Sequence, residues 1–175
     1  MTFGFSVLAA VVMLSGSVSA ADSTAEMHRA TPDGPSDLVG TVMISAGEHG
    51  AVFAINLAGI EPLSEHGFHI HAGGSCEAKE KAGKMVPALA AGGHWDPKNT
   101  GKHEGWQGQG HLGDLPLLHA DAGGQINSVV TVSRITDVAQ LKGHALMLHA
   151  GGDNYSDIPK KLGGGGARML CGVIE

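Results

Sequence analysis

The chemistry that this sequence could perform is concentrated between residues 67 and 114, where five of its 11 histidines lie close to glycine-rich turns. Asp114 follows the last of these histidines by three residues. Imidazole nitrogens and carboxylate oxygens are common ligands of zinc and copper. The plainer alternative is a set of solvated loop histidines that cluster by chance. A composite metal centre explains the pattern better than a packed core or a solvated face.

The first candidate ligands are His69 and His71, which form a His-x-His pair on a predicted strand. Side chains two positions apart on a strand point to the same face, so both imidazoles can converge on one ion. Such a pair alone is weak evidence for a metal. His149 strengthens it, because His149 ends a predicted strand and begins the second long loop just as His71 begins the first.

The second candidate set belongs to the loop that follows, and it consists of His94, His103, His111 and Asp114. Three imidazoles and one carboxylate make a closed tetrahedral site that suits zinc. Two independent sites would conflict with the number of available ligands. The first set has only three ligands unless His94 is counted in both.

The elements that must position these side chains are predicted to be short β-strands. The chain contains 28 Gly and 7 Pro, a backbone freedom that an all-helical chain of this length rarely tolerates. Residues 21–37 have the composition of an irregular segment, with an edge strand at 26–31 as the alternative. Strands are predicted at residues 38–45, 51–57, 66–71, 127–132, 145–148 and 168–174, with one helical turn near 135–141. Long loops at 92–114 and 150–167 would complete a flattened β-barrel or sandwich with its site on one side.

Residues 1–20 are predicted to be a signal peptide, which leaves residues 21–175 as a single domain. The apolar run at 7–14 is too short to span a bilayer, and it ends in Val18-Ser19-Ala20, a small-residue pattern for signal peptidase. No Lys or Arg precedes this run, so an N-terminal strand or a short anchor is the alternative.

The two cysteines, Cys76 and Cys171, are expected to form a disulfide. Export would place the protein in an oxidising compartment, where an isolated pair most often forms a bridge. In a reducing cytosol, two unrelated thiols would be the expectation.

The charge balance limits the classes of partner that the protein is expected to bind. The chain has 11 basic and 17 acidic residues, a formal net charge of −6, and no basic stripe. We therefore expect no nucleic-acid partner and, after export, no membrane partner.

The order of the motifs resembles a known family. The segments G-F-H-I-H, G-G-H-W-D-P, G-K-H, G-H-L-G-D-L-P, H-A-G-G-D and G-G-A-R-M-L-C-G-V-I are similar to those of the copper/zinc superoxide dismutases, especially the exported bacterial branch, over about residues 38–174. The resemblance implies an all-β fold, an eight-stranded Greek-key β-barrel or sandwich in which two long loops form the metal site. It also implies a periplasmic enzyme that converts superoxide to dioxygen and hydrogen peroxide with a Cu ion and a Zn ion.

The resemblance resolves the ligand count, because the family shares one histidine imidazolate between both metals. It implies copper ligands at His69, His71, His94 and His149. It implies zinc ligands at His94, His103, His111 and Asp114. Copper would cycle between two oxidation states, zinc would hold the loop in place, and His94 would carry a proton during turnover.

Two further residues receive roles from the resemblance alone. Arg168 would place its guanidinium beside copper and attract the anion, with Lys160 and Lys161 as weaker candidates for steering. Asp153 would link a copper histidine to a zinc histidine. By contrast, His66 is interpreted as a hydrogen-bonded structural residue.

Some alternatives stay open at this stage. A copper and zinc storage or delivery protein on the same fold is the leading rival, although storage would need neither Arg168 nor Asp153. A zinc hydrolase is disfavoured, since four ligands leave no position for water. Trp106 stands where the family commonly has Pro, and it is expected either to pack locally or to lie at a subunit contact. The sequence leaves a monomer and a homodimer equally open.

Overall fold

The structure is a computed structural model that describes residues 22–175. The predicted signal peptide at residues 1–20 lies outside the described residues and stays a prediction. Within the described part of the chain, no helix has the length and apolar character needed to cross a membrane.

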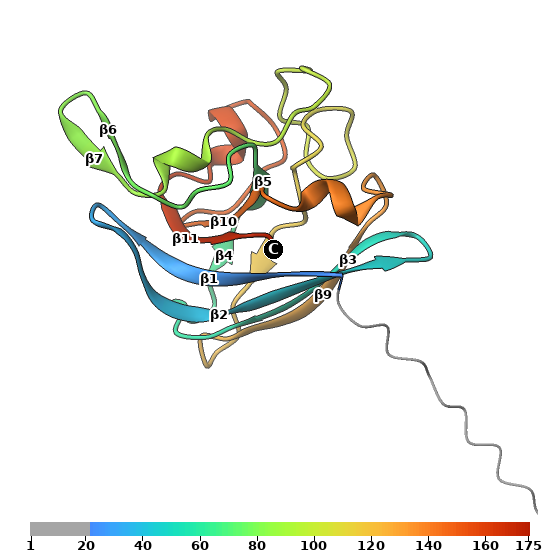
Figure 1. Cartoon of the computed structure of the whole chain (residues 1–175), viewed down its shortest axis with the longest axis horizontal. Helices are drawn as coiled ribbons and strands as arrows, with labels where there is room; N and C mark the ends of the chain where they lie inside the picture. Colours follow the sequence, from blue (N-terminus) through green and yellow to red (C-terminus); the bar gives the residue numbers. More distant parts are fainter. Residues whose placement is uncertain (1–21) are drawn as a thin grey trace, which may run out of the picture.

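Seven antiparallel strands form the main sheet, in the order β5-β10-β11-β1-β2-β3-β9. Figure 1 shows that this sheet is strongly curled. Strands distant in sequence, such as β1 and β11, are neighbours in it, which is the Greek-key type of connection. The bounds are β1 Ser23–Thr31, β2 Gly34–Gly47, β3 Gly50–Leu57, β5 Phe68–His71, β9 Ile126–Val132, β10 Ala145–His149 and β11 Arg168–Val173. The predicted all-β class is confirmed.

The barrel is completed by two very short strands. The strand β4 (Glu65–His66) pairs with β8 (Leu118–His119), and only Gly67 separates β4 from β5. Counting β4 and β5 as one interrupted strand, the barrel has the eight strands that were predicted. No sequence signal marked β8, because two residues are too few to show alternation.

The N-terminal segment corrects the sequence prediction. Residues 23–31 form a regular strand, and β1 lies between β11 and β2 instead of at an edge. Ala25 and Met27 are fully buried and alternate with exposed neighbours, which is the pattern of a half-buried strand. The following Pro32-Asp33 pair forms a tight turn to β2, where the Thr31 hydroxyl donates to the Gly34 carbonyl at 2.7 Å.

The strand β5 is buried on both faces, and this fixes the direction of its histidines. Phe68 meets Phe53 of β3 edge to face across the core, with ring centroids 6.4 Å apart. Phe68 and Ile70 therefore anchor β5 inward. Because side chains alternate along a strand, His69 and His71 point to the opposite face, toward the loops.

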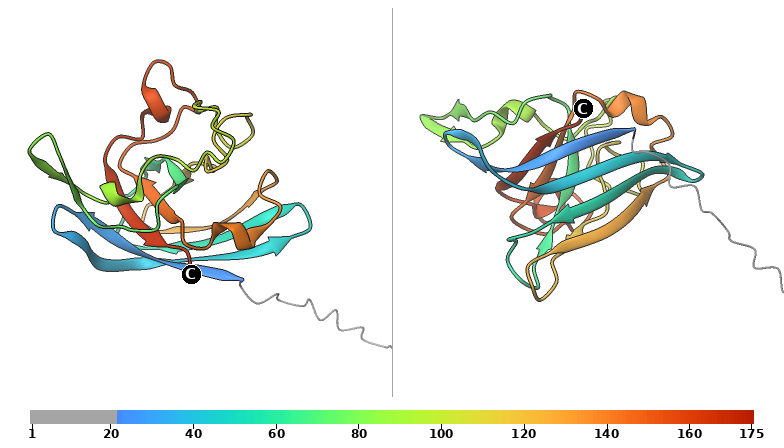
Figure 2. Two further views of the ribbon diagram at one scale, coloured as in Figure 1. Left: turned by 45° about the horizontal axis from the view of Figure 1, so that its top comes forward. Right: turned by 60° about the horizontal axis from the view of Figure 1, so that its bottom comes forward.

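The long loops gather over that outer face of β5, as Figure 2 shows. Residues 92–114 contain no helix or multi-residue strand, as predicted. Isolated bridges instead pair His71 with His94 and His69 with Asp114, so the loop runs along β5. The other connections carry the hairpin β6 (Lys79–Lys81) and β7 (Lys84–Val86) and three 3-10 turns, η1 (Leu89–Ala91), η2 (Val138–Leu141) and η3 (Lys161–Gly164).

The predicted disulfide is present between Cys76 and Cys171. It closes a separation of 95 residues and joins the segment after β5 to β11. Both cysteines are buried and pack in a small satellite cluster with Ala88, Ala91 and Met147. The bridge therefore fixes the segment 76–91 against the strand that begins with Arg168.

Candidate metal centre

Four histidines from three parts of the chain meet on the outer face of β5. His69 and His71 come from β5, His149 ends β10, and His94 comes from the loop 92–114. All four are buried, and their potential ligand atoms lie within 4.8 Å of one another. The structure thus brings together the residues that the sequence predicted for copper.

The hydrogen bonds of His71 and His149 test whether a cation fits between them. His71 Nδ1 lies 2.9 Å from the Gly92 carbonyl, and His149 Nδ1 lies 3.3 Å from the Gly166 carbonyl. A carbonyl can only accept, so each Nδ1 must carry the proton and each neutral ring must present a lone pair at Nε2. These two Nε2 atoms are 3.4 Å apart. Two facing lone pairs repel unless a cation lies between them, so this pair suits a metal.

His69 has one ring nitrogen, Nδ1, available for the same ion as these two Nε2 atoms. Its Nε2 is 2.8 Å from Asp153 Oδ2, while its Nδ1 is buried without any hydrogen-bond partner among the described residues. An unpaired buried nitrogen is costly, and a metal ion would satisfy it. The available donor of His69 is therefore Nδ1.

A second group surrounds the carboxylate of Asp114, which is completely buried. Its Oδ1 lies 2.9 Å from His94 Nδ1 and 3.4 Å from His111 Nδ1, and its Oδ2 lies 3.0 Å from His103 Nδ1. The Nδ1 atoms of His103 and His111 and the Oδ2 of Asp114 have no hydrogen-bond partner in the described structure. Orphaned donors of these types, converging on one point, suit zinc.

The membership of this second group differs in one residue from the predicted zinc set. The atoms that lie within 4.8 Å of one another belong to His69, His94, His103 and Asp114, with His69 in the place of His111. However, His69 already directs Nε2 to Asp153 and Nδ1 to the first group. His111 has an unpaired Nδ1 near Asp114, so its assignment to zinc stays a prediction.

His69 and His94 belong to both groups, and His94 is the one that can direct one ring nitrogen to each. Its Nδ1 faces Asp114, which leaves Nε2 for the first group. Its ring stacks on His69 with centroids 4.0 Å apart. One imidazole therefore connects the two groups, as the count of ligands required.

The pKa values of the histidines in the two groups differ widely, because burial and neighbouring carboxylates act on them in opposite directions. Burial lowers the pKa of His71 well below its usual value, and it lowers the pKa of His94 to about 4 and that of His149 to about 3. Burial also disfavours charge on His103, but the carboxylates of Asp114 and Asp153 outweigh it and raise that pKa to about 9. Without metal, this raised pKa favours the protonated form of His103 between the two carboxylates.

We expect zinc binding at pH 7 to release about one proton from His103. The proton on His103 stabilises the metal-free fold below pH 6.5, and this contribution is lost as the pH rises to about 9. As a zinc ligand, His103 would have to give up that proton, so zinc affinity should rise up to about tenfold per pH unit below pH 9. Calorimetry in buffers of different ionisation enthalpy measures the release. A binding reaction with no proton release at pH 7 would contradict the assignment of His103.

Asp153 ties the two groups together from behind. Its Oδ2 lies 2.8 Å from His69 Nε2, and its Oδ1 lies 2.8 Å from His103 Nε2. Such a carboxylate fixes the orientation of both rings. Gly163 packs directly over it, and a Cβ at this position would lie only 1.9 Å from Asp153 Oδ1. Only glycine fits there.

Arg168 lies at the mouth of the centre, at the start of β11. Its guanidinium donates to the carbonyl of Ala88, in the segment fixed by the disulfide, and to that of Gly92, directly after this segment. A cavity of about 260 Å³ is lined by Arg168, His71, His94 and His149, with Lys161 also on its wall. The cavity is too small for a large substrate and presents a permanent cation beside the histidines.

His66 has the structural role that the sequence suggested. Its Nδ1 lies 2.7 Å from the main-chain carbonyl of His149, and its Nε2 lies 2.6 Å from the Ser64 hydroxyl. His66 is buried and does not belong to either metal group. It positions the backbone of His149.

Sequence reasoning missed two residues that hold the loop backbone. Arg134, just after β9, donates to the carbonyls of Gly110 at 2.7 Å and His111 at 3.1 Å. Asp157 accepts the main-chain N–H of His103 at 3.0 Å. Their partners are backbone atoms, so no side-chain motif marks these contacts. A single Arg and a single Asp carry no spacing signal.

Comparisons with known proteins agree with this geometry. The family model described as copper/zinc superoxide dismutase matches residues 38–174. A superoxide dismutase [Cu-Zn] of Brucella abortus is 49% identical over 94% of this chain and 95% of the relative, and that of Escherichia coli K12 is 47% identical over 99% and 98%. The solved Cu/Zn superoxide dismutase from Brucella abortus has a TM-score of 0.85 at 51% identity, covering 88% of this chain and all of that one. The solution structure of the monomeric enzyme from Salmonella enterica has a TM-score of 0.78 at 51% identity, covering 87% and 99%.

Proposed function

We propose that this chain, which belongs to the copper/zinc superoxide dismutase family, holds its two metals on ligand sets that share His94. The protein is a superoxide dismutase that uses a copper ion and a zinc ion. It converts two superoxide anions and two protons to dioxygen and hydrogen peroxide. What we propose concerns the residues that do this and where the protein works.

The proposed copper ligands are His69 through Nδ1 and His71, His94 and His149 through Nε2. The proposed zinc ligands are His94, His103, His111 and Asp114. The observation that carries the proposal is the pair of facing Nε2 atoms of His71 and His149, 3.4 Å apart. When bound, copper would supply one-electron redox chemistry, and zinc would supply none.

The protein side chains have separate tasks around these ions. Arg168 is proposed to attract and orient the anion in the small cavity, because its charge is permanent and it faces the same space as three copper histidines. His94 is proposed to hold and release a proton at Nε2 during turnover. Asp153 is proposed to keep His69 and His103 in the tautomers that direct Nδ1 to the metals.

Metal storage without turnover is not supported. A storage site would need no cation at its mouth, whereas the Arg168 guanidinium is oriented there by two carbonyls. A zinc hydrolase would need an open position, and the proposed zinc set has four ligands.

Selective metal loss tests the sharing of His94. We expect His71→Ala to lower the copper content and retain zinc, and His111→Ala to lower zinc and retain copper. His94→Ala should weaken both, because His94 is the common ligand. Mass spectrometry of metals after loading with Cu(II) and Zn(II) and gel filtration gives the stoichiometry, with His119→Ala as an exposed histidine control. If His94→Ala lost one metal only, the shared imidazole would be refuted.

We also propose export to the periplasm, with residues 1–20 as the signal peptide and 21–175 as the mature domain. The disulfide supports this proposal, since such bonds persist in oxidising compartments. N-terminal sequencing of protein from a periplasmic extract tests the cleavage site.

Because both ligand sets come from one chain, we propose that a single chain is a complete catalytic unit whether or not a homodimer forms.

A further inference from the structure

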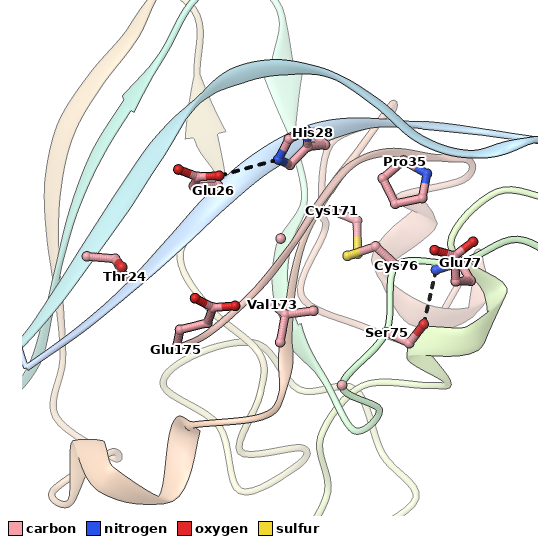
Figure 3. A pocket seen from close by; sticks show the side chains of 12 residues that line it. Thr24, Glu26, His28, Pro35, Ser75, Cys76, Glu77, Cys171, Val173 and Glu175 are labelled. Atoms are coloured by element: carbon pink, nitrogen blue, oxygen red, sulfur yellow. Dashed lines mark hydrogen bonds and ion pairs between the residues drawn. A yellow bond between two sulfur atoms is a disulfide. The ribbon is translucent and has the colours of Figure 1, made fainter.

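A second cavity, of about 430 Å³, lies beside the disulfide and apart from the metal centre. It is formed by β1, the start of β2, the segment that follows β5, and β11 with the C-terminal Glu175, and none of its residues lines the cavity at Arg168. Figure 3 shows the Cys76–Cys171 bridge among the side chains that surround this space. The cavity therefore brings solvent up to the two residues of the bridge.

The wall of this cavity is acidic. Glu26, Glu77 and Glu175 line it, and none of its twelve lining residues is Lys or Arg. His28 is the only basic side chain, and its Nε2 lies 3.7 Å from Glu26 Oε2. Among the described residues, none of the three glutamates forms an ion pair with Lys or Arg. The field in the cavity is therefore negative.

Access to the sulfur atoms is narrow. Cys76 retains 7% of its surface and Cys171 only 1%, and both border the cavity. Thiol exchange requires a thiolate to reach a disulfide sulfur directly. A reagent that attacks the folded protein must thus enter among the three glutamates, and Cys76 is the more accessible target.

We propose that this cavity is a thiol-exchange site that selects small thiols by charge, admitting cationic and neutral thiols and disfavouring anionic ones. The thiolate of the external thiol forms a bond to Cys76 Sγ. The Cys76–Cys171 bond breaks, and its electron pair leaves on Cys171 Sγ. A second thiolate then takes the external sulfur from Cys76. Two thiols become one small disulfide, and their two protons end on the two cysteines.

The expected ratio of exchange rates between thiols follows from their charges. An attacking thiolate already carries one negative charge, and an additional anionic group meets the same glutamates. Exposed charges at close range change a rate by about a few-fold each, and salt screens them. For three glutamates we expect roughly a tenfold preference for a cationic over an anionic thiol at low ionic strength.

The experiment compares three small thiols of similar size on the Cu- and Zn-loaded protein: cysteamine, 2-mercaptoethanol and 2-mercaptoethanesulfonate. The rate of disulfide loss is followed by alkylation and mass spectrometry. The rate for each thiol is divided by the rate at which the same thiol exchanges with bis(2-hydroxyethyl) disulfide, which removes differences in intrinsic reactivity between the thiols. We expect cysteamine to exceed the sulfonate by about tenfold at low salt and by about twofold at most near 1 M salt. The trapped mixed disulfide should lie on Cys76.

Matched variants separate the cavity from the net charge of the protein. Glu26→Gln, Glu77→Gln and Glu175→Gln, singly and together, should raise the sulfonate rate toward the cysteamine rate. Glu61→Gln removes an exposed glutamate that does not line the cavity and should leave the ratio unchanged. Metal content, measured on every sample, confirms that each variant is folded.

Three results would overturn the proposal. The normalised rates of the wild-type protein could be equal for all three thiols at low salt. The rates could be independent of thiol concentration, which would mean that the protein opens before exchange. The mixed disulfide could lie on Cys171. The wild-type comparison decides the question even if the triple variant fails to fold.

Discussion

The variant Arg168→Glu should lower kcat/KM for superoxide on the order of 10- to 100-fold while both metals stay bound; superoxide dismutases are an established example of such electrostatic steering. Superoxide offers almost no surface for packing, so its capture depends on charge and access. Arg168 lines the small cavity with three of the proposed copper histidines. The protein as a whole has a formal net charge of −6, so attraction must come from a local cation.

Two further variants separate charge from geometry at this position. Arg168→Lys should lose less activity, because the charge remains while the planar fork that contacts Ala88 and Gly92 is lost. Lys142→Glu makes the same change of charge at an exposed site outside the cavity and should have little effect. Stopped-flow decay of superoxide across a salt series, with metal content measured on each sample, gives the rates. A fully metallated Glu variant that matched wild type at low salt would remove Arg168 from the steering role.

The second large effect is expected for Asp114→Ala, which should lower zinc affinity by more than about 100-fold. Mutation of a residue that only hydrogen-bonds to a metal ligand already lowers metal affinity by about 10- to 100-fold. Asp114 is proposed as a direct anionic ligand, so its loss should have a larger effect. Its carboxylate is fully buried and lies within 3.4 Å of three histidines. No other carboxylate of the described structure belongs to the group.

Loss of zinc should also lower the melting temperature of Asp114→Ala by about 10 °C. A ligand at 1,000 times its dissociation constant stabilises by about 4 kcal/mol, and a domain of this size changes by about 2–4 °C per kcal/mol. Calorimetry with and without a chelator separates the metal contribution, since wild type and variant should melt closer together without zinc. Full zinc occupancy with wild-type melting in the variant would show that Asp114 is not a ligand.

The residues that gather at the centre could be predicted from sequence because they lie in recognisable local motifs. His69 and His71 show the spacing of a strand face, and the glycine-rich motifs around His94 and His149 identify the family. The disulfide was expected from two isolated cysteines together with the predicted export. Local motifs and the number of cysteines were sufficient for these features.

Other features could not be predicted because their partners are distant in sequence or are backbone atoms. The central place of β1 depends on its pairing with β11, more than 130 residues away, and its sequence alone resembles an irregular segment. Arg134 and Asp157 hold loop carbonyls and amides, which leave no side-chain pattern. The acidic cavity beside the disulfide combines β1, the start of β2, the C-terminal residues from β11 onward and the segment at 74–77, which meet only in the folded barrel.

The central claim is that the copper histidines of this chain carry out superoxide dismutation, and the decay of superoxide in the presence of metal-loaded protein tests it most directly. The mature protein loaded with Cu and Zn should accelerate the decay in proportion to its copper content. His149→Ala removes one of the two facing Nε2 atoms and should reduce the rate to background while zinc remains bound. Stoichiometric binding of both metals by the wild-type protein without catalysis, or full activity in His149→Ala, would contradict the account.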